Sequence, residues 1–408
     1  MVVTGVGLVS PLGQSYTAFC DALLAGEVAI RAAEFTAASG TTRRMVAPLE
    51  SVPRAEYLSE LDSRLYSDLG MVAAYCAETA LRQAGVDLAG VDLDRCGVVF
   101  GSGFMNLHDL ESVYAKFFAG QERRLSPLVI PINMANSPAS RIGMQYGFRG
   151  VARTVSTACS SSSSAIADAW YQVRAGRSDL VIAGGADLVC CASLVRSWER
   201  LRILCPEVDA NALACRPFDR DRNGLALGDG GALFVIENRA HAIDRGASIL
   251  AELDGCFENS DAYDLLKPSQ HGAVRCINGA LQAASLGPND IDLIHAHGTA
   301  TSLNDATEYA ALTEVFTSRL PEIHICAIKS LIGHTMGASG AMNLAAALGS
   351  INHGYVYPVP GFREPDDGAS PRIISAGFAC EPVSRVLINS FAFGGANVCM
   401  VVSTGNTA

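Results

Sequence analysis

Short apolar runs rich in β-branched residues alternate with longer segments of helical periodicity along the whole chain. The apolar runs predict strands over residues 2–6, 96–101, 180–184, 232–237, 292–296, 324–328 and 385–390. The periodic segments predict helices over residues 16–25, 63–84, 272–285, 305–316 and 338–351. Because strands that alternate with helices form sheets covered on their faces, we expect an α/β protein with largely buried sheets.

Two of the helical segments stand out by their lack of charge or their small residues. Residues 337–347 carry no charged side chain, and the segment after Cys159 has a similar small-residue character. Such helices are typical of positions between layers. One of them in each half indicates an internally duplicated fold, although the sequence shows no clear repeat. A polar link at residues 238–250 predicts an N-terminal half over 1–240 and a C-terminal half over 241–408.

Charge and cysteine content argue against several classes of protein. The net charge of −11 disfavours general nucleic-acid binding, and thirteen cysteines without a Cys-x-x-Cys pair indicate reduced thiols and argue against a zinc site. No apolar run reaches the roughly 18 residues that span a bilayer, and no cleavable leader precedes the first strand, so we expect a cytoplasmic location. An acidic partner would need a local basic patch, although any one arginine alone is better interpreted as a solvated charge. The candidates are Arg43, Arg44, Arg123, Arg124, Arg196, Arg200, Arg202, Arg216, Arg220 and Arg222.

Cys159 lies among small residues where the strand-like stretch 152–157 runs into a helix-like segment. A cysteine at a helix N-terminus faces free N–H groups and the positive end of the helix dipole. Both favour the thiolate, so the sequence predicts a pKa below the free value of about 8.5. The usual fate of a cysteine is to be buried and inert. The run of serines and the strand-to-helix corner favour a nucleophile here instead.

Three segments of the C-terminal half each follow a predicted strand, where open α/β sheets place their ligands. The first contains His297, the second contains Lys329 and His334, and the third contains the turn at Phe393. Taken singly, each has an ordinary interpretation as a core histidine, a solvated lysine or a turn between strands. Their joint occurrence with Cys159 indicates one site built from both halves.

Five blocks carry a resemblance to a known family. They are Val3-Thr4-Gly5-Val6-Gly7 with Ser10-Pro11, Thr157-Ala158-Cys159-Ser160, Arg216-Pro217-Phe218-Asp219 with Gly228-Asp229-Gly230, His297-Gly298-Thr299, and Lys329-Ser330 with Gly333-His334. In this order, and with the Phe393-Gly394-Gly395 turn, they resemble the β-ketoacyl synthases of the thiolase-like superfamily over essentially the whole chain. The resemblance implies a duplicated fold, layered α-β-α-β-α, with two mixed sheets around buried helices.

The resemblance also implies a reaction. It is the decarboxylative Claisen condensation of an acyl thioester with malonyl-acyl carrier protein, in fatty acid or type II polyketide or polyene synthesis. Such an enzyme is an acyltransferase that binds no cofactor or metal itself, because its substrates arrive on the phosphopantetheine of an acyl carrier protein. The end of the chain shortly after the last strand predicts a discrete enzyme that meets its carrier in trans.

The family's roles can be carried to matching residues. The resemblance assigns the acyl-carrying nucleophile to Cys159, and the stabilisation of the malonyl enolate to neutral His297 and His334. The backbone N–H groups of Cys159 and Phe393 match the donors for a second oxyanion. Lys329 matches a lysine beside the second histidine, for which both a structural ion pair and a proton-handling role stay open.

Further residues match supporting positions. Glu308 is the expected partner of Lys329, in a charge network that includes Asp305. Thr299 and Thr301 match hydroxyls that hold the phosphopantetheine arm. His295, which the family does not generally have, is expected to be structural.

The gate and the acyl pocket depart from the family's usual pattern. Ala392 stands where a glycine usually precedes the gating Phe393, so we expect restricted motion of that loop. Phe104 matches a position that lines the acyl pocket and would reshape it. Relatives are dimers, so residues 128–134, with Ile130, are expected to contact the pocket of the other subunit. That subunit is either a second copy or a chain-length-factor-like partner.

Two alternative interpretations would give the protein a different function. A non-catalytic, chain-length-determining subunit would keep the fold and lose the nucleophile, yet Cys159, His297 and His334 are all present. A thiolase would carry a second cysteine where this chain has the Phe393-Gly394-Gly395 turn. The acyl length and the choice between fatty acid and polyketide synthesis stay open.

Overall fold

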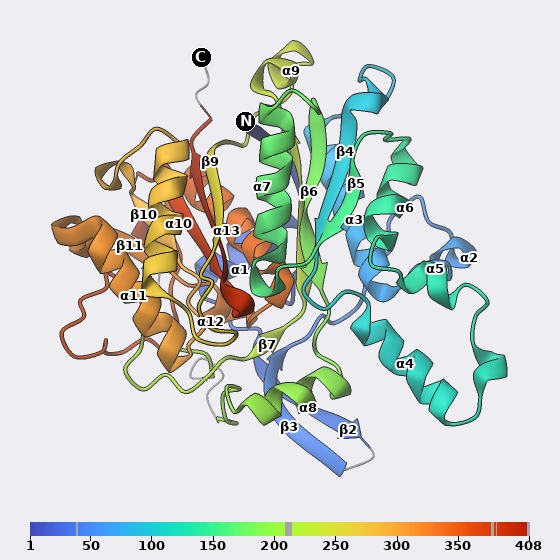
Figure 1. Cartoon of the computed structure of the whole chain (residues 1–408), viewed down its shortest axis with the longest axis horizontal. Coiled ribbons are helices and arrows are strands. Elements are labelled where there is room, and N and C mark those ends of the chain that lie inside the picture. The colour runs from blue at the N-terminus through green and yellow to red at the C-terminus, as the bar shows by residue number, and fades with distance from the viewer. Residues whose placement is uncertain (38–39, 209–213, 377–378, 381, 406–408) are drawn as a thin grey trace.

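A continuous ten-stranded mixed sheet forms the centre of the computed structural model, which describes residues 1–37, 40–208, 214–376, 379–380 and 382–405 (Figure 1). Its order is β11-β10-β14-β15-β9-β1-β8-β6-β4-β5. Five strands come from the first half of the chain: β1 (Val2–Val9), β4 (Cys96–Gly101), β5 (Ala152–Val155), β6 (Leu180–Asp187) and β8 (Gly230–Glu237). Five come from the second: β9 (Ala251–Ser260), β10 (Leu293–His295), β11 (His324–Cys326), β14 (Arg385–Phe391) and β15 (Ala396–Ser403).

The two sets of five strands have the same topology. In each set the first strand pairs antiparallel with the fifth, the fifth antiparallel with the fourth, and the fourth, second and third run parallel. A short antiparallel contact, Val2 with Glu252 and Val3 with Ala251, joins the two sets edge to edge. The expected duplicated fold is therefore confirmed, with its two mixed sheets joined here into one continuous sheet.

Helices fill and cover these sheets. Helices α7 (Ser161–Arg174) and α13 (Ser339–His353) pack against each other and against strands of both sets. The outer face of the first set carries α3 (Asp68–Ala84) and α6 (Ser137–Tyr146), and that of the second carries α10 (Gln270–Ala283) and α11 (Ser302–Phe316). Thirteen residues of α13 are buried, as its lack of charge predicted. This is the expected five-layer α-β-α-β-α arrangement.

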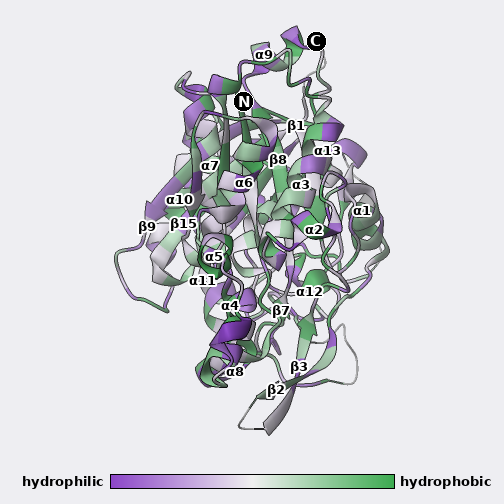
Figure 2. Ribbon diagram, turned by 90° about the vertical axis from the view of Figure 1, so that its right-hand side faces the viewer, coloured by the Kyte–Doolittle hydropathy of each residue, from purple (hydrophilic) through white to green (hydrophobic). Residues whose placement is uncertain are grey.

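Smaller elements complete the fold. The remaining strands are β2 (Arg31–Ala37), β3 (Gly40–Ala47), β7 (Leu227–Gly228), β12 (Tyr355–Val356) and β13 (Ala379–Cys380). The remaining α-helices are α1 (Tyr16–Ala25), α2 (Glu60–Ser63), α4 (Leu107–Phe118), α5 (Val129–Asn133), α8 (Ala192–Leu201), α9 (Arg239–Asp244) and α12 (Lys329–Ile332). Figure 2 shows hydrophobic residues concentrated in the central strands, and the N-terminus lies at the end with α9, far from α8, β2 and β3.

Several predicted boundaries shift in the structure. The helix expected over 63–84 begins later, at Asp68, because Ser67 caps α3 by accepting a hydrogen bond from the Gly70 N–H at 3.0 Å. The strand expected over 324–328 ends at Cys326, since α12 begins at Lys329. Helix α11 begins three residues earlier than expected, at Ser302. Helices α4, α5, α6 and α8 were not predicted.

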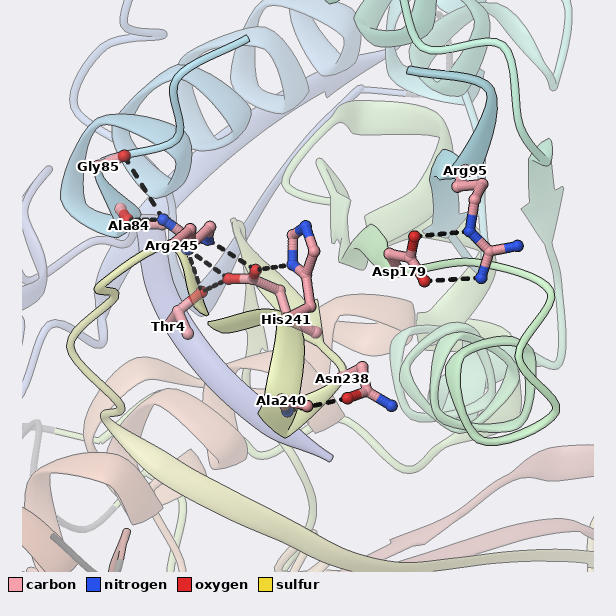
Figure 3. A network of polar contacts seen from close by, with 10 residues as sticks. Thr4, Ala84, Gly85, Arg95, Asp179, Asn238, Ala240, His241 and Arg245 are labelled. Atoms are coloured by element: carbon pink, nitrogen blue, oxygen red, sulfur yellow. Dashed lines mark hydrogen bonds and ion pairs between the residues drawn. The ribbon is translucent and has the colours of Figure 1, made fainter. Parts of the chain in front are cut away.

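A cluster of polar side chains around Glu237 holds the segment after β8 (Figure 3). The fully buried carboxylate of Glu237 accepts a hydrogen bond from Arg245 Nε at 2.8 Å, lies 2.8 Å from His241 Nδ1 and also bonds Thr4 Oγ1. Arg245 donates in addition to the Ala84 carbonyl at the end of α3. These contacts hold the segment 239–245 against β1, β8 and the end of α3. The division of the chain at residue 240 stays a prediction.

In the described part of the chain, no helix is both long and apolar enough to cross a membrane.

Candidate active site

Cys159 lies in a short 3-10 turn between β5 and α7, so the expected strand-to-helix corner is present. Ala158 adopts a left-handed φ of 52°, which turns the chain sharply before the sulfur. Ser161 Oγ accepts from the Thr157 N–H at 2.9 Å and donates to the Ala158 carbonyl at 2.6 Å, and Ser164 Oγ lies 2.9 Å from Thr157 Oγ1. The serine run therefore supplies the hydrogen bonds that fix this corner.

The expected low pKa of the thiol is wrong. Cys159 is 8% exposed, and burial raises its pKa to about 11. The charge on Lys329 and backbone hydrogen bonds from Phe393 and from Cys159 itself act in the opposite direction, but they do not offset the lost hydration. The thiol is therefore protonated in the resting site at neutral pH.

Three predicted side chains from the two halves line one cavity of about 220 Å³: Cys159, His297 and His334. The two imidazole centroids are 5.5 Å apart, and the rings meet edge to face. Burial lowers the pKa of both imidazoles well below the ordinary range, and the charge on Lys329 acts in the same direction. Both rings are therefore neutral, each with one N–H to donate.

The backbone fixes the tautomer of His334. The N–H of Met336 donates to His334 Nδ1 at 3.1 Å, so this nitrogen is an acceptor and Nε2 carries the proton. Ser339 Oγ lies 2.9 Å from the same Nδ1. Within the described residues, Nδ1 of His297 has no hydrogen-bond partner.

Two buried carboxylates of α11 hold the loop that carries His297. Glu308 accepts hydrogen bonds from the backbone N–H groups of His297 and Gly298, both at 2.8 Å. Asp305 accepts from the backbone N–H groups of Thr299 and Ala300 at 3.0 and 3.1 Å. Because Asp305 also binds the N–H of Phe218 and Glu308 binds Asn389 Nδ2, this loop is tied to neighbours on two sides.

The expected ion pair between Lys329 and Glu308 is not formed in the described structure. Lys329 Nζ donates to the carbonyl of His297 at 2.5 Å. Burial lowers the pKa of Lys329 to about 8, and the charge on Glu308 acts in the opposite direction, toward a higher pKa. Lys329 thus holds the histidine loop by a carbonyl oxygen, whereas the carboxylates hold it by backbone N–H groups.

Thr299 and Thr301 line the same cavity, and their hydroxyl oxygens are 2.8 Å apart. The exposed apolar residues Leu201, Leu265 and Leu303 also line it. Asp264 and Lys267 are exposed lining residues as well. The cavity therefore has a mixed lining with two hydroxyls, which suits a long arm with amide groups.

An aromatic wall that the sequence analysis missed closes the other side. Trp198 of α8 lines the cavity, and its ring stacks on Phe393 with centroids 5.9 Å apart. The ring of Phe104 packs edge-on against Trp198, with centroids 6.1 Å apart, and Phe104 does not itself line the cavity. Trp198 therefore contacts both Phe393, which lines the cavity, and the predicted pocket residue Phe104, which does not. Its only sequence signal is an aromatic residue on an amphipathic helix.

Two expectations about the gate and pocket stay predictions. Ala392 has an extended backbone, with φ −131° and ψ 155°, that any residue adopts, so this conformation does not require glycine, and the expected restriction of the loop's motion is not tested by it. Ile130 of α5 is 72% exposed and does not line the cavity of its own chain. Its assignment to a partner subunit's pocket stays a prediction.

Most of the candidate basic patch is already paired with carboxylates. Arg44 and Arg196 both pair with Glu199, and Arg222 pairs with Asp366 at 2.8 Å. Further pairs join Arg43 to Glu207, Arg216 to Asp219 and Arg220 to Glu364.

His295 is buried with Nε2 3.2 Å from Ser350 Oγ, as expected of a structural residue.

Comparison with known proteins identifies the family. Residues 1–242 match the family model "Beta-ketoacyl synthase, N-terminal domain", and residues 250–363 match "Beta-ketoacyl synthase, C-terminal domain". The tetracenomycin polyketide synthase ketoacyl synthase alpha subunit of Streptomyces glaucescens is 32% identical over 97% of this chain and 95% of its own. The 3-oxoacyl-acyl-carrier-protein synthase 2 of Coxiella burnetii is 29% identical over 99% of this chain and 98% of its own.

Solved structures agree with these matches. The ishigamide ketosynthase/chain length factor superposes with a TM-score of 0.90, at 27% identity and over 99% of both chains. A type II polyketide synthase acyl-carrier protein in complex with its ketosynthase, bound to the hexaketide, gives a TM-score of 0.89 at 26% identity, again over 99% of both chains. This chain therefore belongs to the β-ketoacyl synthase family, acyltransferases of thiolase-like fold that carry out the ketosynthase condensation of fatty acid or polyketide synthesis.

Proposed function

We propose that this enzyme condenses an acyl group held on Cys159 with malonyl-acyl carrier protein, releasing CO₂ and a β-ketoacyl-acyl carrier protein. One observation carries the proposal: a thiol from the first half and two neutral imidazoles from the second line one cavity. A nucleophile with two uncharged N–H donors opposite it suits a reaction in which negative charge develops on a thioester oxygen.

In the first step, Cys159 Sγ attacks the acyl thioester, and the thiol proton leaves with the departing phosphopantetheine thiol. Because burial raises the pKa of Cys159, only a small fraction of the thiol is ionised at neutral pH, and this thiolate is the attacking species. Backbone N–H groups of Cys159 and Phe393 lie at the sulfur and are the donors for the tetrahedral oxyanion.

In the second step, the malonyl thioester loses CO₂, and the electron pair of the broken C–C bond forms an enolate. Nε2–H of His334, fixed by the Met336 N–H, is a donor to the enolate oxygen, and His297 supplies a second ring donor. The enolate carbon then attacks the acyl carbonyl. The C–S bond to Cys159 breaks, and the released thiolate takes up one proton.

The carrier and the dimer partner are also proposed here. The cavity lining with Thr299 and Thr301 suits a phosphopantetheine arm, and a related ketosynthase is solved with its acyl-carrier protein. Phe118 of α4 is 82% exposed, and Ile130 and Met134 are exposed nearby in the chain, which supports a subunit interface over this segment. A chain-length-factor-like partner is supported by the ishigamide neighbour. A cytoplasmic location stays a prediction.

The test is intact-mass analysis with a panel of acyl-acyl carrier proteins, followed by malonyl-acyl carrier protein. We expect one acyl adduct per chain, then its loss together with CO₂ and β-ketoacyl product. Cys159→Ala should carry no adduct, whereas Cys190→Ala, a matched control in the same apolar cluster, should load normally. An acyl adduct that persists in Cys159→Ala would refute the nucleophile assignment.

The alternative, a non-catalytic chain-length-determining subunit, is tested by the same experiment. Such a protein would take up no acyl group with any member of the panel.

A further inference from the structure

One buried carboxylate outside the predicted set joins both halves at the site. Asp187, the last residue of β6, is fully buried and accepts four hydrogen bonds. At Oδ1 the donors are Ser102 Oγ at 2.5 Å and the Phe104 N–H at 3.1 Å. At Oδ2 they are the N–H groups of Gly103 at 2.9 Å and of Gly337 at 2.6 Å. Residues 102–104 belong to the first half, and Gly337 belongs to the second.

The bond to Gly337 reaches the imidazole of His334. Gly337 directly follows Met336, whose N–H donates to His334 Nδ1 at 3.1 Å. Both N–H groups belong to the same tight turn, in which Met336 has a left-handed φ of 46°. By holding the second N–H, Asp187 fixes the orientation of the turn that presents the first. That first N–H is what keeps the proton on Nε2.

The backbone at Gly337 and Gly103 is closely packed. A Cβ atom on Gly337 would lie 2.3 Å from the Gly103 nitrogen and 2.6 Å from Asp187 Oδ2. A Cβ atom on Gly103 would lie 3.1 Å from the carbonyl oxygen of Ala158, the residue before the nucleophile. The segments that contain Gly103 and Gly337 therefore pack directly against each other, and Gly103 also packs against the residue before Cys159.

Four donors at one side chain require a carboxylate. Two carboxylate oxygens offer about four lone-pair sites, whereas a neutral carboxyl group or an amide offers fewer. Burial raises the pKa of Asp187 to about 6, and the four hydrogen bonds oppose this rise, so the group is ionised at neutral pH.

We propose that Asp187 is a positioning residue for the condensation, which sets the His334 imidazole and the Phe104 loop in one fixed geometry around the thiol. This inference rests on the proposed function, because it assigns Asp187 a role in the half-reaction that uses His334.

The test separates the two half-reactions in Asp187→Ala. Acyl loading of Cys159 is followed by intact mass, CO₂ release is measured with malonyl-acyl carrier protein, and both are normalised to the folded fraction by circular dichroism. We expect CO₂ release to fall about tenfold or more relative to loading, because small displacements of a catalytic group have effects of that order. An equal fall in both rates, or no fall in either, would overturn the proposal.

A conservative variant and a control sharpen the result. In Asp187→Asn, the amide oxygen can take the place of Oδ2 and keep the bonds from Gly103 and Gly337, whereas the amide nitrogen at the place of Oδ1 loses the bond from the Phe104 N–H. Because the bond to Gly337 remains, we expect Asp187→Asn to recover part of the CO₂ release that Asp187→Ala loses. Ser102→Ala removes a donor to the same carboxylate without touching the turn at Gly337, and should leave the ratio of the two rates unchanged. A Ser102→Ala ratio as low as that of Asp187→Ala would contradict the proposal.

Two further outcomes stay informative. If Asp187→Ala does not fold, Asp187→Ser is measured in the same way, because its single short hydroxyl cannot hold both segments. A wild-type protein that neither loads nor releases CO₂ would refute the proposed function. A normal wild type with an unchanged ratio in the variants would refute only the role of Asp187.

Discussion

The two halves of the molecule share one strand topology, yet they hold their part of the site by different means. In the first half, serine hydroxyls of α7 fix the corner of Cys159. In the second half, the carboxylates of Glu308 and Asp305 hold the histidine loop by its backbone N–H groups. Duplication thus supplies two loops at one cavity, and the polar groups that pin each loop determine whether it presents a nucleophile or oxyanion donors.

The largest expected effect separates these two tasks. Changing both His297 and His334 to Ala should leave acyl loading of Cys159 largely intact and lower condensation by about a thousandfold or more, because preorganised donors to the enolate are lost. Loading is measured by intact mass and condensation by β-ketoacyl product. An equal loss of loading would mean that the imidazoles activate the sulfur, and the division of labour between the halves would fail.

The next prediction compares what pins each loop. Glu308→Ala leaves three buried donors without their acceptor and should lower the free energy of unfolding by on the order of 3 kcal/mol. The control, Glu314→Ala, changes an exposed residue of the same helix and should have little effect. Thermal denaturation followed by circular dichroism measures both. Equal melting temperatures for the two variants would contradict the role given to the carboxylate.

The pH dependence of loading tests the burial of the thiol. Because burial raises the pKa of Cys159 to about 11, the thiolate fraction grows as pH rises, by about tenfold per unit well below the pKa. We therefore expect the loading rate to increase from pH 6 to 8. The increase should become less steep above pH 8, where Lys329 loses the charge that favours the thiolate.

The variant Lys329→Met provides the check on this profile. It should load more slowly at pH 7 and should lack the change of slope near pH 8. A wild-type loading rate that is flat between pH 6 and 8 would show that the thiol ionises below this range, as the helix terminus alone would predict.

The smallest expected effect concerns the aromatic wall. Trp198→Leu should open the chamber toward Phe104 and shift the loading preference to longer acyl groups by a few-fold, since methylene-scale differences in an apolar pocket have modest effects. Leu201→Ala, which alters the mouth and not the wall, is the control. An unchanged preference in Trp198→Leu would place the acyl chain elsewhere.

Sequence patterns predicted the parts of the site that lie at strand ends and in small-residue corners. Cys159, His297, His334 and the α/β alternation fall in this class, because backbone periodicity and motif spacing are local. The pKa of the thiol was predicted with the wrong sign, since burial depends on packing from distant segments. The roles of Asp187 and Trp198 were not found for the same reason: their partners are far away in the sequence.

The most direct test of a site shared between the halves is peptide mapping of the acylated wild-type enzyme, before and after addition of malonyl-acyl carrier protein. We expect the acyl group on the peptide that contains Cys159 and on no other cysteine peptide, and its complete discharge into β-ketoacyl product. An acyl group on another cysteine, or one on Cys159 that malonyl-acyl carrier protein does not remove, would contradict this account.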